Sequence, residues 1–193
     1  MSFRGMKGKP RTPCERTASP PRRTAPQVPL YNHLMRLAVL TISDRCAQGL
    51  FEDTAGPAAA ALLRAEWPAA EIAAHLLADD EDAIAGLLEE LSREGATLIL
   101  TVGGTGLSPR DRTPEATRRV LDREAPGLAE AMRSLGAARN PYAWLSRAVA
   151  GLCGQTLIVN LPGSRRGATE SLASILPLVR HALEIAAGSQ DHP

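Results

Sequence analysis

From residue 36 onward, apolar residues follow two different spacings along the chain. Short apolar runs with β-branched members are typical of buried strands, whereas apolar residues that recur every three or four positions indicate helices. The runs predict strands at 37–42, 97–102 and 156–161, with a weaker, alanine-rich strand at 71–77. The helical spacing predicts helices at 57–66, 81–93, 114–122, 127–135 and 164–187. Residues 49–56 are expected to form a loop.

The alternation of strands and helices determines the expected fold class. Repeated β-α units with short connections are typical of an α/β fold. We therefore expect a three-layer domain in which a mostly parallel sheet carries helices on both faces. Ligands of such open sheets bind at the carboxyl ends of the strands. Polar loops follow three predicted strand ends, at 43–45, 103–111 and 160–164, and we expect these loops to form one site.

The first 34 residues differ in composition from the rest of the chain. They contain seven Arg and Lys residues against the single acid Glu15, together with six prolines. A segment this rich in proline and charge buries too little apolar surface to offset the entropy of ordering. We predict a disordered, basic, proline-rich tail at 1–34, an α/β domain at 35–188 and a C-terminal tail at 189–193.

Charge and cysteine content narrow the classes of function. The net charge of the 193-residue chain is only +1, which argues against a nucleic-acid-binding protein with a basic surface. Cys14, Cys46 and Cys153 lie far apart, so neither a disulfide framework nor a zinc-binding spacing is present. No apolar run approaches the length of about 18 residues that a membrane span needs. We expect a cytoplasmic protein with reduced thiols and no membrane contact.

Aromatic residues make up only 3% of the chain, so the core must be built from Ala, Leu, Val and Ile. We expect Trp67, Trp144 and Tyr142 to be packing residues rather than stacking platforms. The four histidines form no cluster in the sequence, and we assign them no catalytic role.

The segment 103–106 reads Gly-Gly-Thr-Gly and directly follows a predicted strand. A Walker A loop is excluded because the only lysines, Lys7 and Lys9, lie in the tail. A dinucleotide-binding fingerprint is excluded because Pro109 stands where its third glycine should be. The segment is therefore either a tight turn or a nest of backbone N–H groups that holds an anion.

Two predicted helix starts favour the anion-binding interpretation. Thr113 stands before Pro114, which suits an N-cap followed by proline at the first helical position. Ser164 is a second candidate N-cap. The positive ends of both helices would then lie beside the glycine loop, where they favour a polyanion.

Carboxylates near this loop need a separate explanation. Asp111 follows the loop, and Asp79 and Asp80 follow the predicted strand at 71–77. A carboxylate beside a phosphate is repulsive unless a divalent cation such as Mg²⁺ lies between them. The acids are therefore either metal ligands or ordinary partners of helix N-termini and surface cations.

Six short motifs occur in this order with sensible spacing. They are Ser43-Asp44-Arg45, Gly103-Gly104-Thr105-Gly106, Pro109-Arg110-Asp111-x-Thr113-Pro114-Glu115-Ala116-Thr117, Glu124-x-Pro126-Gly127, Leu145-Ser146-Arg147 and Asn160-Leu161-Pro162-Gly163. Together they resemble the molybdopterin adenylyltransferase family of the MogA/MoaB type, and the resemblance covers residues 36–187.

The resemblance implies a fold, a reaction and partners. It implies an α/β domain that forms homotrimers or homohexamers and works with other proteins of molybdenum cofactor biosynthesis. The implied reaction transfers AMP from Mg-ATP to the terminal phosphate of molybdopterin and releases pyrophosphate. ATP and molybdopterin are then the substrates, and Mg²⁺ is the cofactor.

Carried over onto this sequence, the resemblance also assigns site residues. Asp79 and Asp111 become the catalytic acids that hold Mg²⁺, although the family's proline before the first acid is replaced by Ala78, so that Asp80 competes with Asp79. The implied substrate-binding residues are Ser43, Asp44, Gly103, Gly104, Thr105, Gly106, Arg110, Ser146, Arg147, Asn160, Pro162, Gly163 and Ser164. A cation for the phosphates is expected from Arg45, Arg110, Arg147 or Arg165.

The alternative is a non-catalytic carrier or scaffold that binds molybdopterin with the same fold. The presence of acids at 79 and 111 argues against it, because a protein that only binds an anionic pterin would bind more tightly without them.

Overall fold

The computed structural model describes residues 35–188, so the predicted tails at 1–34 and 189–193 lie outside the described residues. Six strands form one sheet in the order β2-β1-β3-β6-β5-β4. The parallel strands are β1 (Arg36–Ile42), β2 (Glu71–Leu77), β3 (Leu98–Val102) and β6 (Thr156–Leu161). The antiparallel strands are β5 (Ala150–Cys153) and β4 (Arg123–Glu124).

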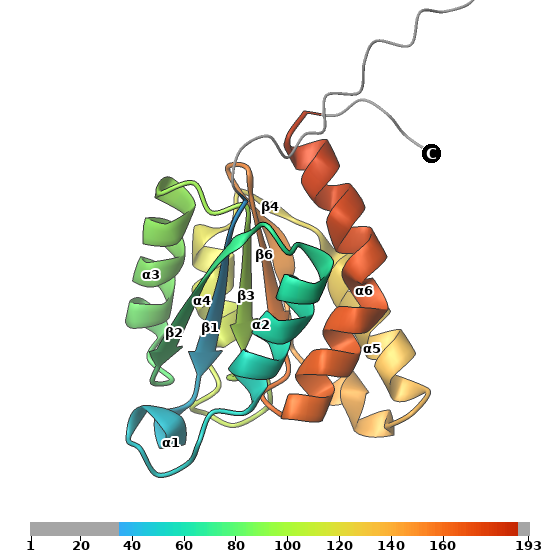
Figure 1. The fold of residues 1–193 in the computed structure, drawn as a ribbon. Helices are drawn as coiled ribbons and strands as arrows, with labels where there is room; N and C mark the ends of the chain where they lie inside the picture. The colour runs from blue at the N-terminus through green and yellow to red at the C-terminus, as the bar shows by residue number, and fades with distance from the viewer. Residues whose placement is uncertain (1–34, 189–193) are drawn as a thin grey trace, which may run out of the picture.

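Helices cover both faces of this sheet (Figure 1). The helices are α1 (Asp44–Ala47), α2 (Ala55–Glu66), α3 (Glu81–Arg93), α4 (Thr113–Val120), α5 (Pro126–Ala137) and α6 (Arg165–Ala186), with a 3₁₀ turn, η1, at Pro141–Leu145. Residues of α2, α5 and α6 pack in one core cluster, and residues of α3 and α4 pack in a second cluster on the opposite face. The predicted three-layer α/β fold with a mostly parallel sheet is confirmed.

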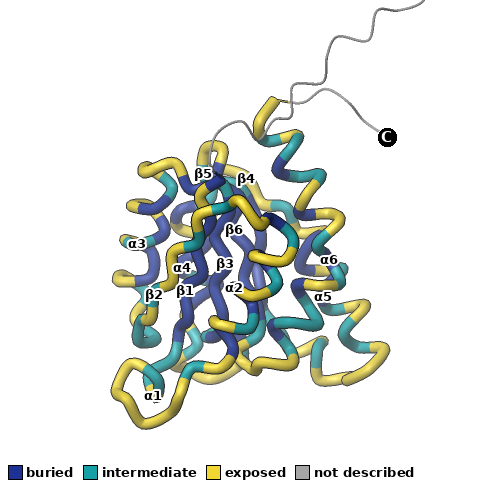
Figure 2. Tube along the Cα trace, viewed as in Figure 1, coloured by how far each residue is buried: buried dark blue, intermediate teal, exposed yellow. Residues whose placement is uncertain are grey.

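The central strands are mostly apolar because both of their faces are covered. All five residues of β3 are buried, and Leu98 and Leu100 face the cluster of α2, α5 and α6 while Ile99 faces that of α3 and α4. Figure 2 shows this buried centre surrounded by exposed helix surfaces and loops. A continuous apolar run is the pattern expected for a strand between two helical layers. No helix among residues 35–188 is long and apolar enough to cross a membrane.

The helix starts agree with the prediction at one position and differ at another. Ser164 caps α6, since its hydroxyl accepts a hydrogen bond from Gly167 N at 3.1 Å. The prediction that Thr113 caps α4 is wrong, because Thr113 is the first residue of the helix and Arg112 is the N-cap. Thr113 instead faces inward, where its backbone N–H donates to Gly104 O at 3.1 Å.

Four short elements were absent from the sequence prediction: α1, η1, β4 and β5. The strand β5 reads Ala-Gly-Leu-Cys, and a strand that begins with Ala and Gly carries little β propensity. The strand β4 has two residues and α1 has four, so neither is long enough to show a period.

Three strand ends meet through backbone contact at glycine. A Cβ placed on Gly103, at the end of β3, would lie 2.2 Å from the carbonyl oxygen of Ile42 at the end of β1. A Cβ on Gly163, after β6, would lie 3.1 Å from the Cα of Gly103. Gly103 also has a φ of +112°, a conformation that side-chain-bearing residues rarely adopt. The loops after β1, β3 and β6 can therefore touch only because glycine stands at 103.

Gly103→Ala is expected to destabilise the fold by roughly 2–5 kcal/mol, since it combines backbone strain with a clash against backbone atoms. Gly95→Ala is the matched control, because Gly95 also has a positive φ, of +85°, but nothing lies within 4 Å of its Cβ position. The control is expected to cost only about 1 kcal/mol. Urea denaturation of both variants measures the difference, and equal losses would contradict the proposed close contact.

Candidate functional site

A cavity of about 1030 Å³ opens at the carboxyl ends of the parallel strands. It lies where α/β folds place their ligands, beside the loops that follow β1, β2, β3 and β6. The predicted site residues that line it are Ser43, Asp44, Asp79, Gly103, Gly104, Thr105, Gly106, Arg110, Asp111, Ser146, Pro162, Gly163 and Ser164. Among the residues predicted to be catalytic or to bind substrate, only Arg147 and Asn160 lie outside its lining, and so does Arg165, one of the arginines expected to bind phosphate.

Asp44 and Asp79 are joined by a reciprocal pair of hydrogen bonds. Asp44 N donates to Asp79 Oδ2, and Asp79 N donates to Asp44 Oδ1, both at 3.0 Å. Arg110 then binds Asp44 with two donors, each 2.9 Å from a carboxylate oxygen. The loops after β1 and β2 are thus fastened together, and Asp44 is neutralised by a cation from the glycine-loop segment.

These contacts move the pKa values of the two acids in opposite directions. The hydrogen bonds from Arg110 are the main reason that the pKa of Asp44 is lowered. Burial is the main reason that the pKa of Asp79 is raised, and the negative charges of Asp44 and Asp111 raise it further. The Oδ1 atom of Asp79 is buried and has no hydrogen-bond partner among the described residues.

The structure distinguishes Asp79 from its neighbour. Asp80 caps α3, since its Oδ1 accepts a hydrogen bond from Ala83 N at 2.8 Å, and it does not line the cavity. Asp79 lines the cavity and lies close to Gly104, where a Cβ would meet Asp79 Oδ1 at 2.8 Å. Asp79 is therefore the acid that faces the site.

Asp111 closes the other end of the glycine loop. Its Oδ2 accepts a hydrogen bond from Ser108 N at 2.9 Å and lies 2.9 Å from the Cβ position of Gly106. Any side chain at Gly104 or Gly106 would therefore collide with one of the two acids. The glycine loop runs between Asp79 and Asp111 without room for side chains at these positions.

The residues suit a divalent cation that is delivered with phosphates. Among residues 35–188, no group of three or more His, Cys, Asp or Glu side chains forms a complete metal site. Asp79 offers a buried oxygen without a partner, and Asp111 offers a second carboxylate nearby. Mg²⁺ commonly takes one or two carboxylates and completes its coordination with phosphate oxygens and water. The donor set therefore fits Mg²⁺ together with a phosphate ligand.

Arg147 and Asn160 differ from the expectation that they contact substrate. Asn160 is fully buried, and its side chain bonds to Val149 N at 3.1 Å and to the hydroxyls of Thr101 and Thr117 at 2.9 Å each. Arg147 directs its guanidinium at the glycine-loop backbone and at Glu115. Both side chains are occupied by the protein itself, so they support the site from behind.

The lining residues that were not predicted as site residues include Phe51, Asp53, Arg139 and Arg166. Asp53 accepts hydrogen bonds from Ala55 N and Gly56 N at 3.0 Å each, and so caps the start of α2. An acid shortly before a predicted helix start was the available signal for Asp53. Arg166 was marked by its place in the turn after Pro162-Gly163, whereas nothing in the local sequence marked Arg139, which lies between α5 and η1.

Of the three aromatic residues expected to pack in the core, only Trp67 is buried. Trp67 packs in the core, as predicted, and is only 9% exposed. Tyr142 and Trp144 are 74% and 60% exposed, so the prediction that they pack is wrong for both. Tyr142 lines the cavity. Phe51 lines it as well, with the Arg45 guanidinium 4.6 Å from its ring centroid.

Asp79→Asn is expected to stabilise the protein at neutral pH in magnesium-free buffer. Because folding raises the pKa of Asp79, the ionised form destabilises the folded state. This effect is absent below the unfolded-state pKa of about 3.9, grows as the pH rises through the folded-state pKa, and is complete above it. The Tm of Asp79→Asn should therefore exceed that of wild type at pH 7, and the difference should vanish towards pH 3.

Asp80→Asn is the control for this experiment, because Asn caps helices as well as Asp does. Its Tm should follow that of wild type at each pH. A gain for Asp79→Asn that persists at pH 3, or a lower Tm at pH 7, would show that the buried charge is not the cause.

Comparison with known proteins identifies the family of the chain. Residues 38–181 match a family described as "Probable molybdopterin binding domain". The chain is 50% identical to the molybdopterin biosynthesis enzyme MoaB of Thermus thermophilus, whose crystal structure it matches with a TM-score of 0.74 over 81% of this chain and 98% of that one.

Curated relatives differ in length. A molybdopterin adenylyltransferase of Helicobacter pylori is 35% identical over 80% of this chain and 89% of its own length. The molybdenum cofactor synthesis protein cinnamon of Drosophila melanogaster is 40% identical over 76% of this chain, but this chain spans only 25% of that longer protein. The chain belongs to the molybdopterin-binding domain family, of the MogA/MoaB type that serves molybdenum cofactor biosynthesis.

Proposed function

We propose that this cavity transfers the adenylyl group of Mg-ATP to the terminal phosphate of molybdopterin. An oxygen of that phosphate forms a new bond to the α-phosphorus of ATP, the bond from this phosphorus to the bridging oxygen breaks, and pyrophosphate leaves. The names of the bacterial relatives from Helicobacter pylori and Escherichia coli support this reaction, since both are molybdopterin adenylyltransferases. The chain covers 89% and 73% of their lengths, respectively.

The observation that carries the proposal is the pair of acids on either side of the glycine loop. Burial is the main cause that raises the pKa of Asp79, the charges of Asp44 and Asp111 raise it further, and both acids would repel an anionic ligand. This arrangement is unfavourable for a site that holds only an anionic pterin. It becomes favourable when a divalent cation accompanies the phosphates.

Nucleotidyl transfer needs positioning and charge neutralisation more than covalent catalysis. Bound Mg²⁺ would neutralise phosphate charge, and Asp79 and Asp111 are the residues that would hold it. The backbone N–H groups of residues 104–106 would provide donors for phosphate oxygens, whereas the N–H of Gly103 already donates to Leu161 O at 3.1 Å. The start of α6, capped by Ser164, adds a positive helix end to the same cavity.

Arginines supply the positive charge that a P-loop lysine would supply elsewhere. Arg45, Arg110, Arg139 and Arg166 line the cavity, whereas Arg147 and Arg165 do not. Arg110 is bound to Asp44 and Arg166 to Glu170, while no ion pair of Arg45 or Arg139 is found among residues 35–188. Arg45, which lies over the Phe51 ring, and Arg139 are therefore the lining arginines that can bind a phosphate without first leaving a carboxylate.

The same proposal includes the setting in which the reaction takes place. We place it in the cytoplasm, with the chain acting as a homotrimer or homohexamer beside other proteins of molybdenum cofactor biosynthesis. The alternative, a carrier that binds molybdopterin without turnover, differs from the enzyme in one measurable quantity, the release of pyrophosphate.

Pyrophosphate release from Mg-ATP in the presence of molybdopterin tests the proposal. Wild type is expected to turn over, and Asp111→Asn and Asp79→Asn are each expected to lose roughly a hundredfold or more in rate while still binding the pterin. Asp82→Asn is the control, because Asp82 is exposed on α3 and pairs with Arg119 away from the cavity. Its rate should stay close to that of wild type.

Two results would contradict the proposal. Wild type that binds molybdopterin but releases no pyrophosphate would identify a carrier. Full activity in both Asp79→Asn and Asp111→Asn would show that the two acids have no part in the reaction.

A further inference from the structure

We propose that Arg147 is a positioning residue, which fixes the conformation of the glycine loop and the position of Asp111. Glu115 orients the guanidinium of Arg147 for this role. The proposal rests on the proposed function for its kinetic consequence. Its structural consequence, an ordered loop, can be measured without any turnover.

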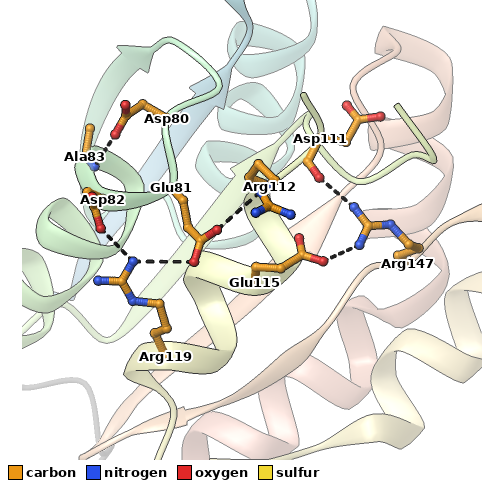
Figure 3. A network of polar contacts seen from close by, with 9 residues as sticks. All are labelled: Asp80, Glu81, Asp82, Ala83, Asp111, Arg112, Glu115, Arg119 and Arg147. Atoms are coloured by element: carbon orange, nitrogen blue, oxygen red, sulfur yellow. Dashed lines mark hydrogen bonds and ion pairs between the residues drawn. The ribbon is translucent and has the colours of Figure 1, made fainter. Parts of the chain in front are cut away.

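The guanidinium of Arg147 binds three groups around the glycine loop, and Figure 3 shows its contacts with Asp111 and Glu115. Its Nε donates to Gly106 O at 2.7 Å, and its Nη2 donates to Asp111 O at 2.6 Å. Its Nη1 donates to the carboxylate of Glu115, on the first turn of α4. The backbone N–H of Arg147 also donates to Thr105 O at 2.9 Å. Residues 105, 106 and 111 are thus held by one side chain and its own backbone.

The segment that carries Arg147 is itself anchored to the core. Arg133, on α5, donates from Nη1 to the carbonyl oxygens of Ser146 and Ala148, each at 3.2 Å. Asn160, on β6, accepts a hydrogen bond from Val149 N at 3.1 Å. The backbone on either side of Arg147 is therefore held by α5 and β6, and the hydrogen bonds of Arg147 connect the glycine loop to these two elements.

The charge of Arg147 is already used within the protein. Burial alone would raise the pKa of Glu115, but the hydrogen bond from Arg147 and the nearby positive charges outweigh it, so that the pKa is lowered. The side chain of Arg147 is 31% exposed and does not line the cavity. Three of the five N–H donors of this guanidinium already bind a carboxylate and two carbonyl oxygens of the protein, and the side chain lies outside the cavity lining.

A loop with three glycines needs side-chain contacts from outside to hold it in one conformation. Glycine gives the backbone room to pass between Asp79 and Asp111, but it also gives the loop more conformational freedom than other residues would. A misplacement of about 1 Å in reacting groups can lower a rate by roughly a hundredfold. A planar guanidinium with several fixed donors can hold three acceptors at once, whereas the single ammonium of lysine cannot hold them in the same geometry.

Arg147→Lys is the test variant, and Arg119→Lys is its matched control. Arg119 belongs to the neighbouring ion-pair network, in which it binds Asp82 at 2.7 Å and Glu81 at 3.4 Å, but it touches neither the glycine loop nor Asp111 (Figure 3). Both variants exchange one arginine for lysine in an ion pair. Only the first removes contacts to the loop.

Three measurements are compared between the variants. Amide hydrogen exchange reports the order of residues 103–113, calorimetry reports the affinity for magnesium tripolyphosphate, and pyrophosphate release gives kcat and KM for Mg-ATP. For Arg147→Lys we expect faster exchange confined to 103–113, tripolyphosphate affinity and KM within about threefold of wild type, and kcat lower by roughly a hundredfold. Glu115→Gln should change the same quantities in the same direction by less, and Arg119→Lys should change none of them.

Each contrary result has a separate meaning. A tenfold or larger loss of tripolyphosphate affinity with unchanged loop exchange would make Arg147 a phosphate ligand and overturn the proposal. Faster exchange throughout the chain would reduce its role to general stability and overturn it as well. If wild type binds tripolyphosphate but makes no pyrophosphate, the proposed function fails, while the exchange data still decide whether Arg147 orders the loop.

Discussion

The site depends on the backbone contact between the ends of β1, β3 and β6. Gly103 lies so close to the carbonyl oxygen of Ile42, and Gly163 so close to Gly103, that these turns pack without side chains between them. This contact brings polar loops that are far apart in the sequence to one edge of the sheet. The reciprocal hydrogen bonds between Asp44 and Asp79 then add the end of β2 to the same cavity.

Charge determines what this cavity can hold. Both acids and arginines line it, and some of them form ion pairs in the free protein, as Arg110 does with Asp44. Asp79 stays poorly solvated, and its Oδ1 has no protein partner among the described residues. Under the proposed function, a cation that arrives with a polyphosphate would give the carboxylates a partner and separate their charge from that of the phosphates. Arg147, Glu115 and Asn160 are bound to groups around the glycine loop and would keep it in place.

Much of this architecture could be predicted from the sequence, because β1, β3 and β6 are buried on both faces and are therefore mostly apolar. The loops after these strands could be placed in one site because the carboxyl ends of parallel strands meet at one edge of the sheet. The direction of individual side chains could not be predicted. Arg147 and Asn160 stand in polar motifs beside the cavity, yet the sequence does not show that their donors and acceptors are used by the protein. Asp79 and Asp80 are adjacent acids, and only the backbone geometry makes one face the cavity and the other cap α3.

The affinity for ATP as a function of magnesium concentration tests the central claim most directly. Calorimetric titration of the purified chain with ATP, first in EDTA and then in increasing Mg²⁺, measures it without any need for molybdopterin. If Asp79 and Asp111 hold a cation between themselves and the phosphates, ATP should bind at least tenfold more tightly with saturating Mg²⁺ than in EDTA, as an order-of-magnitude expectation from charge neutralisation. An affinity that is unchanged or weakened by Mg²⁺ would contradict the account, because the two acids would then have no role in binding the nucleotide.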